Sequence, residues 1–496
     1  MSLSEKVKES LKKRIDSPDR KKIKKRTRHY PGYDYRIDLR ALESKSGDDF
    51  SFLALGDTGA GGDAKNAVAR DMGREENDNT DFLLHLGDVV YLSGSKQGYK
   101  KRFINVYKKW ILAGHRNRKN LVFSKPFLPI YGNHDYYDMQ KALSIVSRII
   151  GRVFRALGTG SKNGKVFDKV FVEQDDNRIE VHTTAGNSGL PYIPEEATRI
   201  PNRYYWFTYK NCAFIALDSN TLDATKDEQP IKIADFEDEF EQLRNEANEA
   251  RELVKLTKKR SEDPDQDNKS RLEYEHLLAV EESGECEKRM ASFLKRVDRK
   301  PADHDVAQLD WLKYVLNHDE VRDKLKIIYM HHSMYVSDES HTADHQVFGL
   351  RKNLMDIITD SGVSLVLSGH SHCFECVKAS DYPDVCFIVS GAGGQNPSKS
   401  IFELNDKEKE KKLFLEKAET LAYANEDNGK ELYNYLRINV ETDKIEVKPV
   451  GVFEDSERPT DLGKYLFPVK TFSDLKFRKL DRVVIKKDGW EVELTD

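Results

Sequence analysis

Short apolar runs that stop at a glycine and a polar residue recur along the first part of the chain. The first three of these runs cover residues 50–55, 81–86 and 126–131, and they stop at Gly56, Gly87 and Gly132. Apolar runs of this length between turn residues are typical of buried strands. Ala64 to Arg74, between the first two runs, has the spacing of a helix. The pattern therefore predicts an α/β fold in which strands and helices alternate as βαβ units.

The same kind of pattern returns in the second half of the chain. The further strands that it predicts cover residues 204–207, 212–218, 326–330, 363–368 and 386–390. Residues 308–316 have the alternation of an amphipathic helix, and residues 432–450 have the pattern of a hairpin. We see no internal repeat.

Two long insertions interrupt these predicted strands. In the first, at about 139–200, apolar residues near helical spacing alternate with arginines; they are Leu143, Val146, Ile150, Val153 and Leu157. This pattern fits a lid over a substrate, a helix on a membrane surface, or a helix docked on the domain. The second, at 222–304, is rich in charged residues and has leucines near helical spacing. It predicts a helical, hairpin-like insertion that either contacts a protein partner or is a solvated surface excursion.

The ends of the chain differ from its middle. Residues 1–48 are poor in apolar residues and carry a basic run at 20–26. Such a run fits a nucleic acid or anionic lipid contact, but we favour a solvated basic tail. Residues 456–496 are charged and have strand-like stretches without a chemical motif. The compact domain is therefore expected at 49–455, with the two insertions inside it.

Composition limits the class of protein. The 496 residues have a formal net charge of −4, which gives no global sign of nucleic acid binding. No apolar run reaches the ~18 residues that a transmembrane helix needs, so no integral membrane segment is expected. The N-terminus lacks the apolar core of a signal peptide, and five cysteines suit a reducing compartment. We expect a cytoplasmic protein, and a secretion route without a cleaved signal stays open.

Five short segments carry polar residues just past the predicted strands. They are Gly56-Asp57-Thr58-Gly59, Gly87-Asp88-Val89-Val90-Tyr91, Gly132-Asn133-His134-Asp135, Ile328-Tyr329-Met330-His331 and Gly369-His370-Ser371-His372. Ligands gather at the carboxyl ends of strands in α/β sheets. Carboxylates suit hard cations, and imidazoles suit zinc, iron and related metals. Each segment alone is ordinary, but the five together predict a metal site.

A site for two metal ions also needs a bridging ligand, because neighbouring cations repel each other. A carboxylate on a tight turn can bridge them, and Asp88 is the candidate, with Asp57 on one ion only. Asn133 offers a neutral carbonyl oxygen to the other ion. His370 and His372 are two residues apart and can reach different ions from one loop.

These segments resemble the calcineurin-like metallophosphoesterases and, among them, the purple acid phosphatases. Most relatives have a histidine two residues after the first aspartate, where this chain has Gly59, and Tyr91 follows Asp88 by three. The resemblance covers about 50–450 without the insertions. Its further parts are 201–205, 217–219, 308–312 and 390–393. It implies a β-sandwich of two mixed sheets flanked by helices.

The resemblance also implies roles for individual residues. The first metal ion would be bound by Asp57, Asp88, Tyr91 and His372, and the second by Asp88, Asn133, His331 and His370. It implies iron(III) at the first position and iron, zinc or manganese at the second. His134 would contact the phosphate, and His341 would protonate the leaving group. Because His332 is adjacent to His331, the choice between them rests on aligning Met334-Tyr335 with the family.

The implied activity is hydrolysis of phosphate monoesters by direct attack of a metal-bound hydroxide, as in an acid phosphatase. A phosphodiesterase or nucleotide hydrolase with the same site is the alternative within enzymes. A binding or scaffold protein that works through its insertions and basic tail is the alternative from another class. Cys373 and Cys376 form a single Cys-x-x-Cys pair, which without a second pair is weak evidence for a zinc or redox site.

Overall fold

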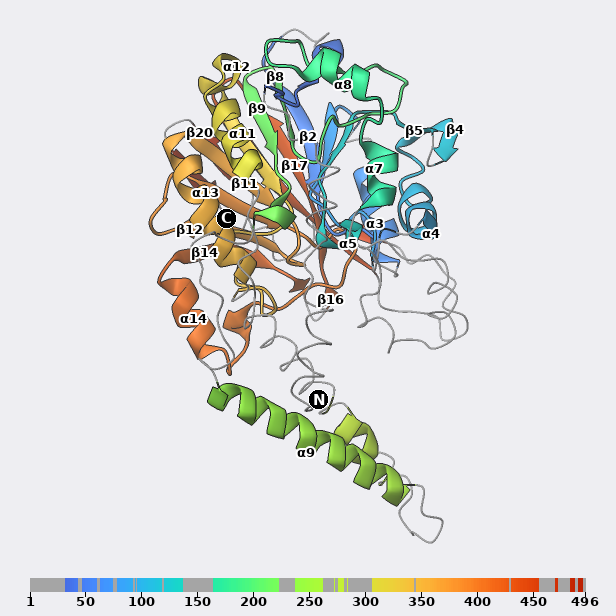
Figure 1. Cartoon of the computed structure of the whole chain (residues 1–496), viewed down its shortest axis with the longest axis vertical. Helices are drawn as coiled ribbons and strands as arrows, with labels where there is room; N and C mark the ends of the chain where they lie inside the picture. Colours follow the sequence, from blue (N-terminus) through green and yellow to red (C-terminus); the bar gives the residue numbers. More distant parts are fainter. Residues whose placement is uncertain are drawn as a thin grey trace. The chain divides into compact units, whose positions relative to one another are not determined.

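The computed structural model describes most of the predicted domain (Figure 1). The described residues are 32–42, 47–59, 63–74, 78–91, 94, 96–117, 120–136, 164–222, 237–261, 272, 275–280, 283, 306–342, 345–427, 430–454, 469–471, 482–486 and 489–493. The basic run at 20–26 and the predicted helix at 143–157 lie outside them. The chain divides into two compact units, one made of Met1–Asp16 with Ala224–Asp303 and the other of Ser17–Asp223 with His304–Asp496.

The larger unit contains two mixed sheets. Among the described residues, the first sheet has the strand order β21-β20-β18-β17-β2-β3-β6 along its main path. Its strands are β2 (Phe50–Leu55), β3 (Phe82–His85), β6 (Phe127–Pro129), β17 (Tyr433–Val440), β18 (Lys444–Glu454), β20 (Arg482–Lys486) and β21 (Gly489–Glu493). Strands β2, β3 and β6 are parallel, whereas β17 pairs antiparallel with β2. The carboxyl ends of β2, β3 and β6 therefore lie at one edge.

The second sheet has the described strand order β14-β12-β13-β11-β10-β9-β8. Its strands are β8 (Tyr205–Tyr209), β9 (Cys212–Ala216), β10 (Leu325–Met330), β11 (Val363–Ser368), β12 (Phe374–Ala379), β13 (Cys386–Ser390) and β14 (Ala418–Ala424). The central strands β9, β10, β11 and β13 run parallel. Their burial on both faces explains why they are almost continuously apolar in the sequence.

Aromatic side chains join the two sheets in the core. Phe52 of β2 and Phe82 of β3 both meet Phe214 of β9 edge-to-face, with ring centroids 5.3 Å apart in each pair. Edge-to-face pairs of this kind add about 0.5–1.5 kcal/mol beyond their buried area. The predicted α/β sandwich of two mixed sheets is confirmed.

Helices flank the sandwich (Figure 1). The helix α3 (Ala64–Met72) packs on β17 and β18, and α11 (Val306–Leu316) contacts α13 (His345–Asp360). Shorter helices include α7 (Lys165–Phe171), α8 (Asp176–Thr183), α12 (Asp319–Arg322) and α14 (Glu408–Leu415). The helices predicted at 64–74 and 308–316 are confirmed with slightly different ends.

Ordered strands also lie outside the predicted domain, both before residue 49 and after residue 455. In the predicted tail, β1 (Ile37–Asp38) pairs with β7 (Leu190–Pro191), and Trp311 Nε1 donates to the carbonyl of Asp34 at 2.8 Å. In the predicted C-terminal extension, β20 and β21 join the first sheet, and β19 (Val469–Thr471) pairs with β18. The strands β12 and β14 and the hairpin β4 (Ile111–Asn117)–β5 (Asn120–Phe123) were not predicted.

The smaller unit carries the long helix α9 (Glu237–Ser261), which confirms the helical character predicted for part of 222–304. Leu253 and Leu256 on this helix are 41% and 47% exposed. Its use in partner contact stays a prediction. Among the described residues, no helix combines the length and the apolar character that crossing a membrane requires.

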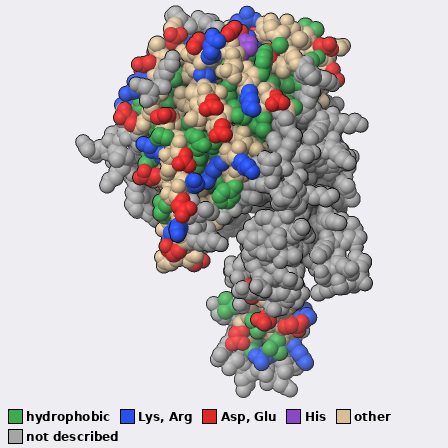
Figure 2. Space-filling view, turned by 60° about the vertical axis from the view of Figure 1, so that its left-hand side comes forward, with side chains coloured by type: hydrophobic (Ala, Val, Ile, Leu, Met, Phe, Trp, Pro, Cys, Tyr) green, Lys and Arg blue, Asp and Glu red, His purple; other side chains and the backbone are tan. Residues whose placement is uncertain are grey.

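Charge is mixed on one face of the described structure. On the face in Figure 2, lysines and arginines alternate with aspartates and glutamates between apolar side chains. Neither sign dominates the described part of this face, which agrees with the small net charge of the chain.

Candidate metal centre

The polar residues of the five sequence segments meet where strands of both sheets end. Asp57 follows β2, Asp88 follows β3, and Asn133 starts the short helix α5 (Asn133–Tyr136) after β6. From the second sheet, His331 follows β10 and His370 follows β11. Backbone hydrogen bonds tie these turns together, from Asp57 N to Gly87 O (3.0 Å) and from Gly369 N to His331 O (3.0 Å).

Three of these turns have an unusual backbone. Asp57, Asp88 and His370 have φ values of 59°, 52° and 67°, in the left-handed region that non-glycine residues rarely adopt. Each such residue costs about 1–3 kcal/mol and persists where the surrounding structure enforces it. Three such residues at neighbouring strand ends mark the place as a candidate functional site.

Two glycines leave room for the carboxylates. A Cβ on Gly132 would lie 2.0 Å from Asp88 Oδ1, and a Cβ on Gly369 would lie 2.6 Å from Asp57 Oδ2. Any side chain at either position would displace a carboxylate. This close approach explains why glycine precedes the polar residue in these segments.

One half of the site gathers around Asp57. The hydroxyl of Tyr91 donates to Asp57 Oδ1 and lies 3.1 Å from His372 Nε2. His372 Nε2 is 3.8 Å from Asp57 Oδ1. The carboxylate, phenol and imidazole predicted for the first metal ion are thus brought together.

The other half gathers around His331. Its Nε2 lies 2.9 Å from Asn133 Oδ1, 3.2 Å from His370 Nδ1 and 3.6 Å from Asp88 Oδ1. Its Nδ1 lies 2.8 Å from the carbonyl oxygen of Leu86. A backbone acceptor on one ring nitrogen is the usual arrangement for a histidine that binds a metal through the other nitrogen.

The electrostatics of the site also favour cations. Burial, reinforced by the neighbouring Asp88, holds the pKa of Asp57 well above its usual range. Burial lowers the pKa of all three histidines. The pKa of His331 is lowered, the pKa of His370 falls well below its usual value, and the pKa of His372 falls to about 3. The imidazoles are therefore neutral, and they do not compensate the buried carboxylates. A bound cation would compensate them, because metal ligation favours the charged carboxylate and the neutral imidazole.

The donor atoms fit a metal site by geometry as well. One ligand atom from each of Asp57, Asp88 and His331 lies within 4.8 Å of the others. Asp88 Oδ2 and His370 Nε2 are buried and have no hydrogen-bond partner in the described part of the chain. Buried polar atoms are usually paired, so an uncompensated carboxylate oxygen beside three imidazoles fits a site that holds metal ions.

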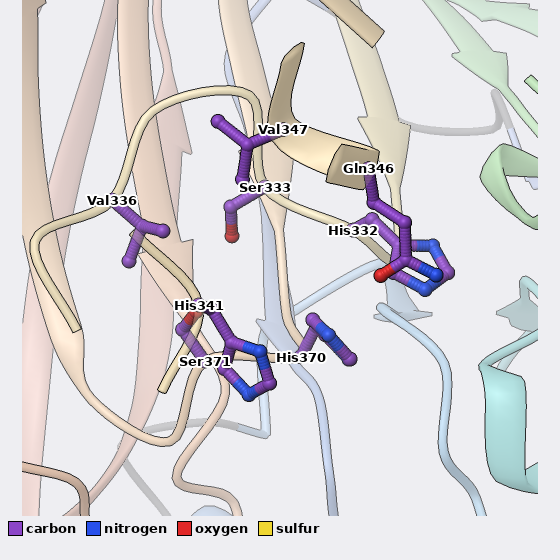
Figure 3. Close-up of a pocket in the computed structure, with 8 residues that line it drawn as sticks. All are labelled: His332, Ser333, Val336, His341, Gln346, Val347, His370 and Ser371. Carbon is purple, nitrogen blue, oxygen red and sulfur yellow. The ribbon is translucent and has the colours of Figure 1, made fainter. Parts of the chain in front are cut away.

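The two predicted catalytic histidines flank these ligands. The backbone N–H of His134 donates to Asp88 Oδ1 at 2.8 Å, and its Nε2 lies 4.0 Å from Asp88 Oδ2. The ring of His341 lies 4.2 Å from that of His370, centroid to centroid. His341 and His370 line a pocket with His332, Ser333, Val336, Gln346, Val347 and Ser371 (Figure 3).

If the centre binds two metal ions, replacing His331 or Asn133 with alanine should remove mainly one of them, because both side chains belong to the same half of the site. His332→Ala should keep both, since His332 Nδ1 bonds Ser219 Oγ at 2.9 Å. We expect activity to fall much further for His331→Ala than for His332→Ala, because the loss even of a group that only orients a metal ligand typically costs about 10–100-fold. Metal analysis with kinetics checks this. A greater loss of metal in His332→Ala would exchange the two assignments, because His332 also lies within ligand range of His331 and His370.

Asp135 organises the site and was not predicted to do so. Its Oδ2 accepts the N–H groups of Val89 and Gly132, each at 3.1 Å, and its Oδ1 accepts the hydroxyl of Tyr99 at 3.0 Å. The side chain thereby joins the turn after β3 to the turn after β6. The sequence feature that could have indicated this role is the position of Asp135 in the segment Gly132-Asn133-His134-Asp135.

Comparison with known proteins gives one match to a family. Residues 50–222 match the family model for calcineurin-like phosphoesterases. The matched range contains Asp57, Asp88, Tyr91, Asn133 and His134, whereas His331, His370 and His372 lie beyond it. The structure brings the latter three to the former. The predicted resemblance to the calcineurin-like metallophosphoesterases is confirmed. A search of curated proteins found no match.

Solved structures match this chain at low identity and low TM-score. One is described as GAP50, the anchor in the inner membrane complex of Plasmodium, with 15% identity, coverage of 85% of this chain and 89% of that chain, and a TM-score of 0.40. A purple acid phosphatase from yellow lupin seeds has 10% identity and a TM-score of 0.43, and the match covers 86% of this chain and 54% of the phosphatase. The phosphopantetheinyl hydrolase of Mycobacterium tuberculosis has 12% identity and a TM-score of 0.28, and the match covers 70% of this chain and 90% of the hydrolase. At these scores the likenesses give no information on function.

Proposed function

We propose, from the match of residues 50–222 to the calcineurin-like phosphoesterases, that this chain hydrolyses phosphate monoesters at a dinuclear metal centre. The observation that supports this most is the convergence of carboxylate, phenol, amide and imidazole groups at the ends of five strands from two sheets. A metal-dependent phosphoester hydrolase is the activity that the family match supports. The preference for monoesters over diesters is our own proposal and goes beyond the family match.

The ligands divide between two positions. Asp57, Asp88, Tyr91 and His372 would hold the first ion, and Asp88, Asn133, His331 and His370 would hold the second. When bound, two such ions lower the pKa of a water molecule, orient the phosphate and neutralise its charge. The protein contributes the fixed directions of these side chains, which the strained turns at Asp57 and Asp88 maintain.

The two remaining histidines act on the substrate. The backbone of His134 is anchored on Asp88, so its imidazole, beside the carboxylate, is placed to donate a hydrogen bond to a phosphoryl oxygen. His341 lines the neighbouring pocket and would donate its proton to the leaving oxygen (Figure 3). General acid catalysis of this kind contributes about 10²–10⁴-fold.

Selective hydrolysis of monoesters tests the function. The purified protein, loaded with iron, zinc or manganese, should hydrolyse an alkyl or aryl phosphate monoester faster than the corresponding diester. A chelator should abolish the activity, and added metal should restore it. A higher rate on the diester would favour the phosphodiesterase alternative. An absence of hydrolysis by protein that holds two metal ions would favour a binding role.

Tyr91→Phe tests whether the first ion is iron(III). Without a cation, burial and the adjacent Asp57 hold the pKa of Tyr91 well above its usual range. A bound trivalent ion would reverse this shift and deprotonate the phenol, because the charge of the ion dominates the local electrostatics. Iron(III) with a phenolate ligand absorbs visible light. The oxidised protein should therefore be coloured, and Tyr91→Phe should be bleached while it keeps its fold.

The absorption spectrum and iron content, measured after mild oxidation, check this prediction. A visible band that survives in Tyr91→Phe, or an active iron-containing protein without a band, would contradict iron(III) at the first position. The dinuclear phosphoesterase assignment would stand in that case.

We also propose a cytoplasmic location. Among the described cysteines, Cys212, Cys373, Cys376 and Cys386 are buried free thiols, which suits a reducing compartment. Cell fractionation tests this, and recovery of the chain outside the cytoplasm would contradict it.

A further inference from the structure

A buried carboxylate outside the proposed ligand set lies close to the centre in sequence. Glu375 on β12 is completely buried, three residues after His372. Its Oε2 accepts the backbone N–H of Ser337 at 2.9 Å, and its Oε1 accepts the hydroxyl of Thr420 at 2.6 Å. Burial raises the pKa of Glu375 to about 7. Burying a carboxyl group is costly unless its oxygens accept hydrogen bonds. Here one of the two bonds comes from a loop backbone, at Ser337.

The loop that Glu375 holds is the one that carries His341. Ser337 directly precedes a tight turn in which the carbonyl of Asp338 accepts the N–H of His341 at 3.2 Å and that of Thr342 at 3.0 Å. The position of the His341 backbone is thus set by the residue next to Ser337. Asp338 is itself fully buried, so the base of this turn is fixed in the protein interior.

A second segment supports the same turn. Residues 398–401 lie along it, with hydrogen bonds from Ile401 N to Ser337 O (2.7 Å) and from Glu339 N to Lys399 O (2.9 Å). The hydroxyls of Ser337 and Ser400 lie 2.9 Å apart. The same segment also reaches the centre, because Ser398 N donates to the carbonyl of His372 at 2.8 Å.

The His341 turn and the His372 loop are therefore connected by two routes. One route is the side chain of Glu375, on the strand that follows His372. The other is the backbone of residues 398–401. Removing Glu375 should break the first route and loosen the turn, which the second route would still hold, without removing a proposed metal ligand.

We propose that Glu375 is a positioning residue for His341, which it holds at the leaving-group side of the metal centre by fixing the backbone of Ser337. The proposal rests on the proposed role of His341 as general acid. It assigns a function to a buried group that neither binds metal nor contacts substrate. Its removal should affect protonation of the leaving group more than any other step.

The dependence of the rate on the leaving group distinguishes this role from a general loss of structure. An alkyl phosphate needs protonation of its leaving oxygen, whereas p-nitrophenyl phosphate releases a stable anion and needs little. Glu375→Ala should lower kcat on the alkyl phosphate by about 100-fold and on p-nitrophenyl phosphate by less than about tenfold. The metal content should stay unchanged. Glu375→Gln keeps a carbonyl acceptor for Ser337 and a donor for Thr420, so it should restore most of the lost rate.

A double-mutant cycle with His341→Ala completes the experiment. If Glu375 acts through His341, Glu375→Ala should add almost nothing to the loss already present in His341→Ala. Thr420→Val is the matched control, because it removes the other hydrogen bond of Glu375 and leaves the bond to Ser337. It should lower stability without changing the ratio of the two rates. Glu375→Asp, which keeps the charge but shortens the side chain, provides the same test if Glu375→Ala does not fold.

Equal losses on both substrates in the Glu375 variants, or additive losses in the double variant, would overturn the positioning role. If His341→Ala itself loses both activities equally, the general-acid role of His341 fails and the positioning role fails with it. In both cases the hydrolysis of monoesters by the native protein would remain, which separates these results from a failure of the proposed function.

Discussion

Replacing Asp88 with alanine should remove metal binding and hydrolysis together. Asp88 is the proposed bridge. Its Oδ1 lies 3.6 Å from His331 Nε2, and its Oδ2 lies 4.0 Å from His134 Nε2. Without it, two neighbouring cations would lose the negative charge between them. Because two-metal catalysis provides several kcal/mol of stabilisation, and each 1.36 kcal/mol is tenfold in rate, we expect kcat to fall by at least about 10³-fold.

Metal analysis and phosphatase kinetics on the purified variant check this result. The fold should be largely retained, since Asp57 no longer faces a second buried carboxylate. Asp381→Ala is the control, because this carboxylate is 62% exposed and its ion pair with Lys417 is long, at 3.6 Å. It should leave metal content and rate unchanged. Two metal ions per chain in Asp88→Ala would show that Asp88 does not bridge them.

Replacing Gly59 with alanine should disrupt the first half of the site. A Cβ at this position would lie 2.1 Å from Val90 Cα and 2.5 Å from Tyr91 N, so it would meet backbone and not a movable side chain. The N–H of Tyr91 donates to Gly59 O at 3.2 Å, and the same displacement would move the tyrosine away from Asp57. Overpacking of this kind costs about 1–3 kcal/mol and occasionally more, and we expect about 3 kcal/mol here.

Denaturant unfolding and metal analysis measure the two consequences of Gly59→Ala. Gly73→Ala is the matched control, because the nearest atoms to a Cβ there would be Lys109 Cδ at 3.4 Å and the carbonyl oxygens of Ala69 and Arg70 at 3.5 Å, which are ordinary contacts. It should change the free energy of unfolding by less than about 1 kcal/mol. A Gly59→Ala protein with native stability and full metal content would show that the loops separate without cost.

The alternation of strands and helices was determined locally by the sequence. The strand at Phe50–Leu55 and the strand at Val363–Ser368 were predicted with the bounds that the structure has. Their side chains form apolar runs that stop at a glycine, and this signal depends only on neighbouring residues. The residue types after each strand likewise indicated metal chemistry, because carboxylate, amide and imidazole donors follow from the sequence alone.

Elements that depend on distant partners were not visible in this way. The edge strand β14 (Ala418–Ala424) is only partly buried, and its pairing with β12 decides that it is a strand. The segment that contains β1 resembled a tail in composition, yet it pairs with β7 and bonds Trp311 across 277 positions. Weak local patterns of this kind become structure only when another part of the chain supplies the hydrogen bonds.

Some features of the metal centre follow from the sequence, and others follow only from the tertiary structure. The sequence determined which residues follow the strands, and the resemblance to a family supplied their proposed division between two ions. Only the tertiary structure decided that His331 Nε2 lies 2.9 Å from Asn133 Oδ1, 198 positions away, and that Asp57, Asp88 and His370 adopt left-handed backbone conformations. It also decided that Glu375 supports the turn of His341. The physical reason is that periodicity and residue chemistry are local properties, whereas the packing of one sheet on another brings together groups that no short-range pattern connects.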